Sequence, residues 1–325
     1  MQLWDIYKLT VEKGLEADPR GSQKASQSLE RLRQSYEKLP AAEKQWFDTE
    51  LLSNPYPDTR LLYGEPGTEI KHLFVGIDIR VSELLLVDRL NQKGAQIDAV
   101  MAHHPEGIAL TTLHQAMDLQ RDIFQSCGVP VNIADHILAR EADKTHFDIT
   151  VGNYNRVVDA ARLLNLPLLT AHTPTDNMVQ AYIQQKLAEA APETLADILA
   201  ILELEPEYNL ARKLEAGPKL MFGSPENRVG KIMVDMTGGT DAGPELYDKL
   251  SAAGVGTVVA MHLSPGVREV LEKGHVNIVL AGHMSSDSLG LNLLMDQLEL
   301  QGVRITAGSG FTRVSRHPDT RRLLN

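Results

Sequence analysis

The sequence predicts an α/β protein built from two similar βαβ-containing lobes that follow an N-terminal helical extension. The first 70 or so residues are polar and have a helical period. Beyond them, short apolar runs typical of buried strands alternate with helical stretches, and this alternation occurs twice. We therefore expect a helical arm over residues 1–70, a first lobe with a helical insertion over 71–222 and a second lobe over 223–325.

The arm contains one clear amphipathic helix, in the segment SQSLERLRQSYEKL. It places Leu29, Leu32, Tyr36 and Leu39 at three- and four-residue spacings, so one face of the helix is apolar. The turn-rich stretch SNPYPDTRLLYGEPG closes the arm. We find no chemistry in this arm and expect it to serve packing or subunit contact.

Two βαβ units follow the arm. In the first, the strand HLFVGIDI, the helix SELLLVDRLNQKG and the strand IDAVMA follow in order, and in the second KIMVDMTGG, PELYDKLSAAG and VGTVVAM do the same. Helix, glycine, strand and histidine keep one order in both. This order is consistent with an internal duplication and equally with the arrangement that all βαβ units share.

Four predicted strands end in histidine. The runs are AVMAHH, PLLTAH, TVVAMH and IVLAGH, which end in His103 with His104, His172, His262 and His283. Ligands of parallel α/β sheets gather at the carboxyl ends of the strands. Neutral imidazoles packed together there need a cation or a carboxylate to satisfy their lone pairs.

Carboxylates follow two of these histidines at the same offset. AHTPTD gives H-x-x-x-D with Asp176, and AGHMSSD gives H-x-x-x-D with Asp287. We expect Ser285 or Ser286 to cap the helix that follows, which would set Asp287 in or beside its first turn. Asp287 could instead only stabilise the helix start. Its repetition after a second strand-end histidine favours a ligand.

Imidazole and carboxylate together suit a hard or borderline divalent cation, and shared carboxylates commonly bridge two ions. We expect two divalent ions of zinc, iron or manganese. The single cysteine, Cys127, excludes a thiolate metal cluster and an internal disulfide framework.

The motifs AVMAHHP, AHTPTD and AGHMSSD together resemble the Nif-three-like family, also called GTP cyclohydrolase I type-two homologues. The resemblance covers residues 70–325 and implies two similar α/β lobes with a dinuclear metal site between them, in homo-oligomers that are often hexameric rings. It implies metal ligation by one set of residues: His103, His104, Asp176, His283 and Asp287. The family usually has glutamate where this chain has Asp287.

Three functions remain open from the sequence. The first is a metal-dependent hydrolase that activates a metal-bridging water against a nucleotide or related heterocycle, with His172 and His262 transferring protons. The second is a non-catalytic metal-binding assembly or interaction protein. The third is a phosphate-binding module on MTGGTDAGPE and TAGSGFTR, where Arg313 would contact an anionic substrate.

Composition narrows the partners. A formal net charge of −11 argues against general nucleic-acid binding, which needs clustered lysine and arginine. The first 20 residues lack the apolar core of a secretory signal, and no apolar run is long enough to span a bilayer. We therefore expect a cytoplasmic protein that acts on a small molecule, and the family resemblance implies that it is a homo-oligomer.

Overall fold

The computed structural model describes residues 1–317 and confirms an α/β fold with two sheets and N-terminal helices. The first sheet has the strand order β1-β4-β3-β2-β9 and the second β5-β8-β7-β6. The strands are β1 (Leu61–Tyr63), β2 (His72–Gly76), β3 (Ala99–Ala102), β4 (Leu168–Thr170), β5 (Lys219–Phe222), β6 (Lys231–Asp235), β7 (Val255–Ala260), β8 (Asn277–Leu280) and β9 (Arg304–Gly308).

The two sheets repeat one topology. In each, three parallel strands lie beside one antiparallel edge strand: β2, β3 and β4 beside β1, and β6, β7 and β8 beside β5. Strand β9 is an addition that pairs in parallel with β2. This shared order agrees with the repeat that the sequence suggests, and it extends the likeness beyond one βαβ unit to four strands.

Helices cover both faces of both sheets. The longer ones are α1 (Leu3–Glu16), α2 (Ser22–Lys38), α4 (Val81–Gln92), α6 (Asp118–Ser126), α7 (Val131–Thr150), α8 (Arg156–Leu163), α9 (Thr173–Ala190), α10 (Leu195–Glu203), α14 (Pro265–Lys273) and α15 (His283–Leu300). The shorter ones are α3 (Ala41–Lys44), η1 (Thr49–Leu52), α5 (Gly107–Thr111), η2 (Leu113–Met117), α11 (Pro206–Arg212), α12 (Pro244–Tyr247) and α13 (Lys249–Ala252).

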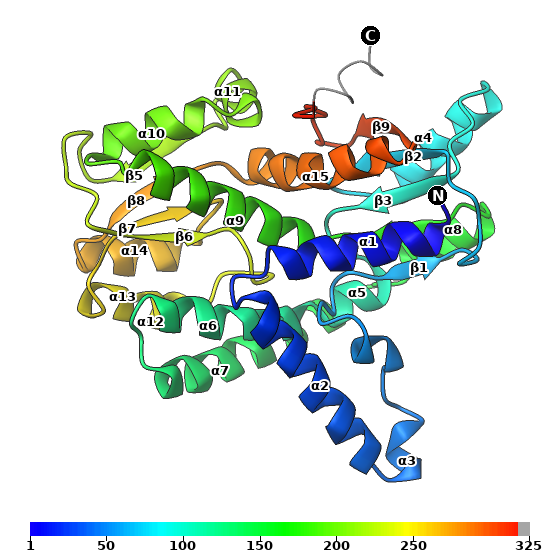
Figure 1. Ribbon diagram of the computed structural model, residues 1–325, viewed down its shortest axis with the longest axis horizontal. Helices are drawn as coiled ribbons and strands as arrows, with labels where there is room; N and C mark the ends of the chain where they lie inside the picture. Colours follow the sequence, from blue (N-terminus) through cyan, green and yellow to red (C-terminus); the bar gives the residue numbers. More distant parts are fainter. Residues whose placement is uncertain (318–325) are drawn as a thin grey trace.

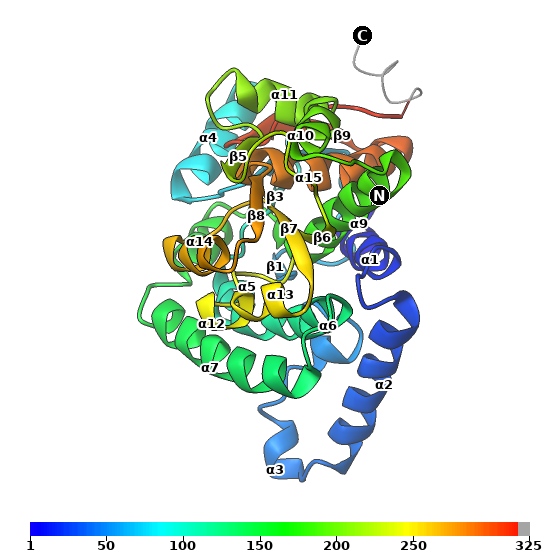
Figure 2. The ribbon, with the colours of Figure 1, turned by 90° about the vertical axis from the view of Figure 1, so that its left-hand side faces the viewer.

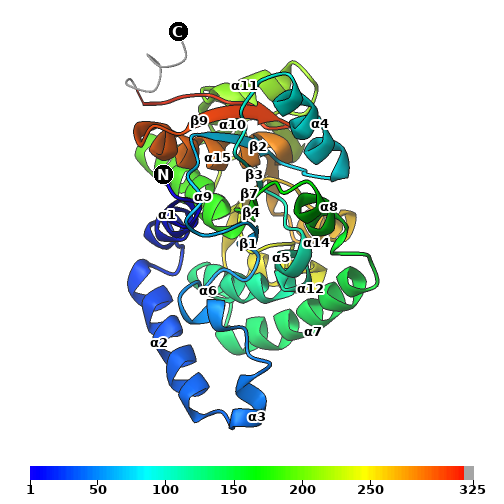
Figure 3. The ribbon, with the colours of Figure 1, turned by 90° about the vertical axis from the view of Figure 1, so that its right-hand side faces the viewer.

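Helices α9 and α15 pack against each other between the two sheets (Figure 1). One face of α15 contributes Leu291 and Leu294 to the core of the first sheet, while Leu289 packs into the core of the second. Helices α4 and α8 cover the opposite face of the first sheet (Figure 3). The α9–α15 pair is therefore the layer that both sheets share.

The two halves of the chain cross over in space. Helices α6 and α7 come from the first half of the sequence, yet Phe124 and Ile137 pack into the core of the second sheet beside Leu246 and Val258. Helix α14 joins the same core (Figure 2). The lobe boundaries expected from the sequence stay a prediction, because this packing and the pairing of β9 with β2 interlock the two sheets.

The N-terminal extension has a buried part and a projecting part. Leu3 and Ile6 of α1 are fully buried in the core of the first sheet, so α1 belongs to the body of the molecule. Helices α2 and α3 extend away from it (Figure 1). Of the apolar stripe on α2, Leu29 is buried, and Tyr36 contacts Phe47 in a tilted arrangement with ring centroids 4.9 Å apart.

Within residues 1–317, none of the helices combines the length and the apolar character that crossing a bilayer requires.

Candidate metal centre

All four predicted strand-end histidine positions are confirmed. His103 and His104 directly follow β3, and the other three lie two or three positions beyond the ends of β4, β7 and β8: His172, His262 and His283. These strands run parallel within their sheets. Each sheet therefore delivers its histidines to the edge where the α9–α15 layer begins.

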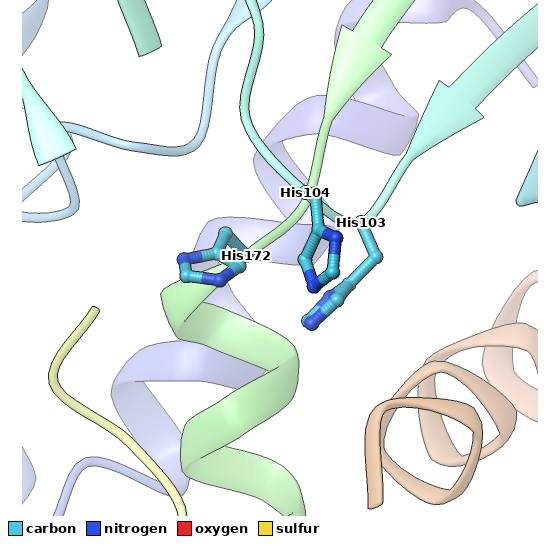
Figure 4. A group of neighbouring side chains, drawn as sticks. All are labelled: His103, His104 and His172. Carbon is cyan, nitrogen blue, oxygen red and sulfur yellow. The ribbon is translucent and has the colours of Figure 1, made fainter. Parts of the chain in front are cut away.

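The rings from the first sheet converge (Figure 4). The ring centroids of His103 and His172 are 4.9 Å apart, and those of His103 and His104 are 5.2 Å apart. The second sheet brings His283 to 5.3 Å from His104. Side chains separated by up to 180 positions in the sequence thus meet in one cluster, as a shared site requires.

The two aspartates lie one helical turn after their histidines. His172 is the N-cap of α9, and His283 is the first residue of α15, so Asp176 and Asp287 face the same side as the histidine before them. The predicted serine cap was wrong. Gly282 is the N-cap, and its φ of +110°, which suits glycine, turns the chain into the helix three or four residues earlier than expected.

Asp287 lies between two groups of possible ligands. Its Oδ1 is 3.5 Å from Nε2 of His103, which is also 3.5 Å from Oδ1 of Asp176. Its Oδ2 is 3.5 Å from Nε2 of His104 and 3.6 Å from Nε2 of His283. These separations are too long for hydrogen bonds. They match two atoms bound to one ion at tetrahedral angles, which lie roughly 3.4 Å apart.

Orphaned carboxylate oxygens support a cation at this place. Oδ1 of Asp176 and both carboxylate oxygens of Asp287 are buried and accept no hydrogen bond within residues 1–317. Buried charges without partners are strongly unfavourable, so such oxygens call for a positive charge that protein side chains do not supply. The donor set of imidazole nitrogen and carboxylate oxygen fits a divalent ion.

The first-sheet histidines are held by their Nδ1 atoms. The Nδ1 atom of His103 donates to the carbonyl oxygen of Ala171 at 3.0 Å, that of His104 to Asp78 at 3.0 Å, and that of His172 to Asp58 at 2.8 Å. Carbonyl and carboxylate oxygens accept only, so each Nδ1 carries a proton. When the ring is neutral, Nε2 is then the free ligand atom, as in many metal sites.

Burial and neighbouring charges set the protonation of the cluster. Burial opposes ionisation of Asp287, but His103, His104 and His283 together outweigh burial and lower the pKa of Asp287. Burial raises the pKa of Asp176 to about 6. Burial lowers the pKa of His283 to about 4, which keeps this imidazole neutral and able to bind an ion near pH 7. For His172, burial opposes protonation, yet Asp176 and Asp58 raise its pKa to about 9.

We expect Asp58→Asn to lower the pKa of His172 in the metal-free protein, because the carboxylate that stabilises the charged ring is lost. Wild-type His172 should hold its proton up to about pH 9, and the variant should release it at lower pH, as followed by NMR titration. The metal-loaded variant should lose activity about 10- to 100-fold. Asp159→Asn, at an exposed ion pair, is the control. An unchanged His172 titration would exclude Asp58 as the positioning residue.

A cavity that is open to solvent adjoins the cluster, and its lining includes Asp235, Tyr247 and the glycine-rich stretch after β6. His262 also faces it, with its ring centroid 4.5 Å from that of His283, and burial lowers the pKa of His262. The structure thus brings both proposed proton-transfer residues, His172 and His262, to one cavity.

Arg313 lies elsewhere. Its guanidinium is paired with Asp296 and with Glu299, at 2.6 Å from Oε2 of the latter, and donates to Asn292 at 3.0 Å. It does not line the cavity beside the histidines. The predicted contact of Arg313 with an anionic substrate stays a prediction, and its N–H groups are already used in this buried network.

Comparison with known proteins comes down to solved structures, since no family model and no curated protein matches. The crystal structure of a NIF3 superfamily protein from Sphaerobacter thermophilus superposes with a TM-score of 0.72 at 26% identity, over 78% of this chain and 92% of that one. The chain is therefore NIF3-like. Reduced HcgD from Methanocaldococcus jannaschii is also similar (TM-score 0.47, 14% identity, 76% of this chain and 87% of that one).

Sequence reasoning missed four carboxylates at the site of this NIF3-like chain. Asp58 and Asp78 orient histidines, and Asp235 and Asp241 line the cavity. Asp58 lies in the arm to which no chemistry was assigned, so that expectation was wrong. Asp235 had a signal, since it ends β6 as the histidines end their strands.

Proposed function

We propose that this NIF3-like protein is a dinuclear divalent-metal hydrolase that acts on a nucleotide or related heterocycle. The observation that carries the proposal is the position of Asp287. Each of its carboxylate oxygens faces a different ligand group, His103 with Asp176 on one side and His104 with His283 on the other. A carboxylate in this position can bridge two ions.

The proposed site residues divide into metal ligands and residues that transfer protons. The five proposed metal ligands are the ones that the family resemblance implies: His103, His104, Asp176, His283 and Asp287. When bound, paired divalent ions such as zinc, iron or manganese lower the pKa of a water molecule and polarise the group under attack. His172, oriented by Asp58, and His262 are proposed to move protons at the cavity.

His172 has a second possible part in this arrangement. Its ring lies within ligand range of His103 and His104, and its Nε2 is 3.8 Å from Oδ2 of Asp176. Fixed by Asp58 at its other nitrogen, it can either complete the coordination of one ion or accept a proton beside it. The Asp58→Asn titration described above separates the two roles when it is repeated with metal bound.

The test is metal analysis of protein purified without chelator, followed by hydrolysis assays on nucleotides and cyclic amides. The blank is the variant with both His103 and His104 changed to alanine. We expect about two ions per chain and turnover that the blank lacks. Two ions per wild-type chain, together with equal hydrolysis rates in the wild type and the blank, would indicate a metal-binding assembly or interaction protein without turnover. Fewer than one ion would contradict the proposed metal centre.

We also propose that the protein forms a homo-oligomer, with the hexamer that the family resemblance implies as the specific form. Trp46, which follows α3 in the projecting segment and is 84% exposed, offers an apolar side chain for such contacts. Light scattering of the full chain at several concentrations measures the assembly directly.

A further inference from the structure

The second-lobe wall of the cavity carries a carboxylate that the metal centre does not use. Asp235, the last residue of β6, is only 8% exposed and lines the same cavity as the ligand cluster. The hydroxyl of Tyr247 donates to its Oδ2. Within residues 1–317 its Oδ1 makes no hydrogen bond, yet it is not among the fully enclosed polar atoms. This oxygen is therefore available to something inside the cavity.

Asp235 is held in place by the layer that carries the metal ligands. Gln180 of α9 donates to the carbonyl oxygen of Val234 at 2.7 Å and accepts from the backbone N–H of Met236 at 2.8 Å, so its side chain pairs with the edge of β6 on both sides of Asp235. Gln180 lies one turn after Asp176 on the same helix. The carboxylate and the ligand cluster thus share one rigid support.

The charge of the cavity is unusual for a phosphate site. Among residues 1–317, four aspartates line it, namely Asp176, Asp235, Asp241 and Asp287, and no lysine or arginine does. Two divalent ions would offset those four negative charges and leave no surplus for a triphosphate. Enzymes that bind polyphosphates add lysine, arginine or a phosphate-binding loop to their metal ions.

The glycine-rich stretch after β6 does not fill that gap. Asp241 accepts from the backbone N–H groups of Gly243 and Ser264, and the backbone N–H of Thr240 donates to Gly238. Some backbone N–H groups of this stretch are therefore already used within the loop. The carboxylate of Asp241 would also repel an incoming anion. A substrate with hydrogen-bond donors suits this wall better than one with negative groups.

We propose that the site takes a small cyclic substrate that is uncharged or cationic and carries N–H groups, and that Asp235 binds one of those N–H groups. This inference rests on the proposed function and narrows it: nucleoside triphosphates are excluded, and an uncharged or cationic heterocycle or cyclic amide is the substrate class. Asp235 is here a substrate-binding residue that selects donors and rejects anions.

The experiment uses two rings that differ in one charge. Dihydrouracil is neutral and has N–H donors, while dihydroorotate is the same ring with a carboxylate, and GTP serves as the triphosphate. Their binding to the metal-loaded protein is measured by titration calorimetry. We expect dihydrouracil to bind at least about tenfold more tightly than either anion. Equal or tighter binding of an anion, or no binding of dihydrouracil, overturns the inference.

Asp235→Asn tests the residue. Because the Tyr247 hydroxyl would keep the amide oxygen, the amide nitrogen would face the cavity and repel a substrate N–H. We expect the preference for dihydrouracil to fall at least about tenfold at unchanged metal content, whereas Asp248→Asn on the surface should keep it. An unchanged preference in Asp235→Asn overturns the assignment. If the wild-type protein binds two ions per chain but shows no preference for dihydrouracil, this inference alone is refuted. If it binds fewer than one ion per chain, the proposed function is refuted as well.

Discussion

Asp287→Ala is expected to remove both ions from the protein and to reduce turnover at least about 1000-fold, equivalent to roughly 4 kcal/mol. The reason is that this one carboxylate belongs to both ligand groups, through Oδ1 to one and Oδ2 to the other. Asp176→Ala and His283→Ala should each lose a single ion, because each residue belongs to one group. Elemental analysis of the three variants gives the occupancies.

Asp248→Ala is the matched control for these variants, since Asp248 is exposed and pairs only with Lys249. It should keep wild-type metal content and activity. Retention of two ions by Asp287→Ala would contradict the shared carboxylate. Loss of both ions from Asp176→Ala would contradict the division into two groups, because one ion should remain on His104 and His283.

Arg313→Ala is expected to lower the free energy of unfolding by about 3–5 kcal/mol, because it leaves two buried carboxylates without their cation. The side chains of Asp296 and Glu299 are 7% and 5% exposed, and Arg313 pairs with both. Urea denaturation of the metal-free protein measures the loss without a contribution from bound ions. Metal content should be unchanged, since none of these residues is in the ligand groups.

Arg268→Ala is the comparison for this prediction. Arg268 makes a half-exposed ion pair with Glu272 on α14, and removing such a pair costs at most about 1 kcal/mol. If Arg313→Ala were as stable as wild type but bound substrate more weakly, the earlier expectation of an anion contact at Arg313 would be correct and the structural role assigned here would be wrong.

The histidine cluster could be predicted because it follows from local patterns. Each histidine ends a short apolar run, and parallel strands present their carboxyl ends at one edge of a sheet. The repeated H-x-x-x-D spacing likewise pointed to Asp176 and Asp287, and the helix period places each aspartate beside its histidine. These local patterns do not depend on the distance between the residues in the sequence, so they identified histidines and aspartates on both sheets.

The supporting residues could not be predicted in the same way. Asp58 lies 114 positions before His172 in an irregular turn, and no periodic pattern marks such a residue as a partner. Arg313 was ambiguous for another reason. The local sequence pattern of an arginine after a glycine turn is the same whether its side chain contacts a substrate or a buried carboxylate. Only the fold shows that Arg313 pairs with Asp296. Tertiary packing, which brings these partners together, has no local signature in the chain.

Gly290 allows α15, which carries Asp287, to approach α9, which carries Asp176. A side chain there would begin 2.3 Å from the carbonyl oxygen of Thr175, so α15 and α9 touch backbone to backbone, three residues after Asp287 and one before Asp176. The spacing between the two carboxylates is thus set by main-chain contact and not by flexible side chains. Moving Asp176 and Asp287 further apart or closer together would require the two helices to shift as a whole.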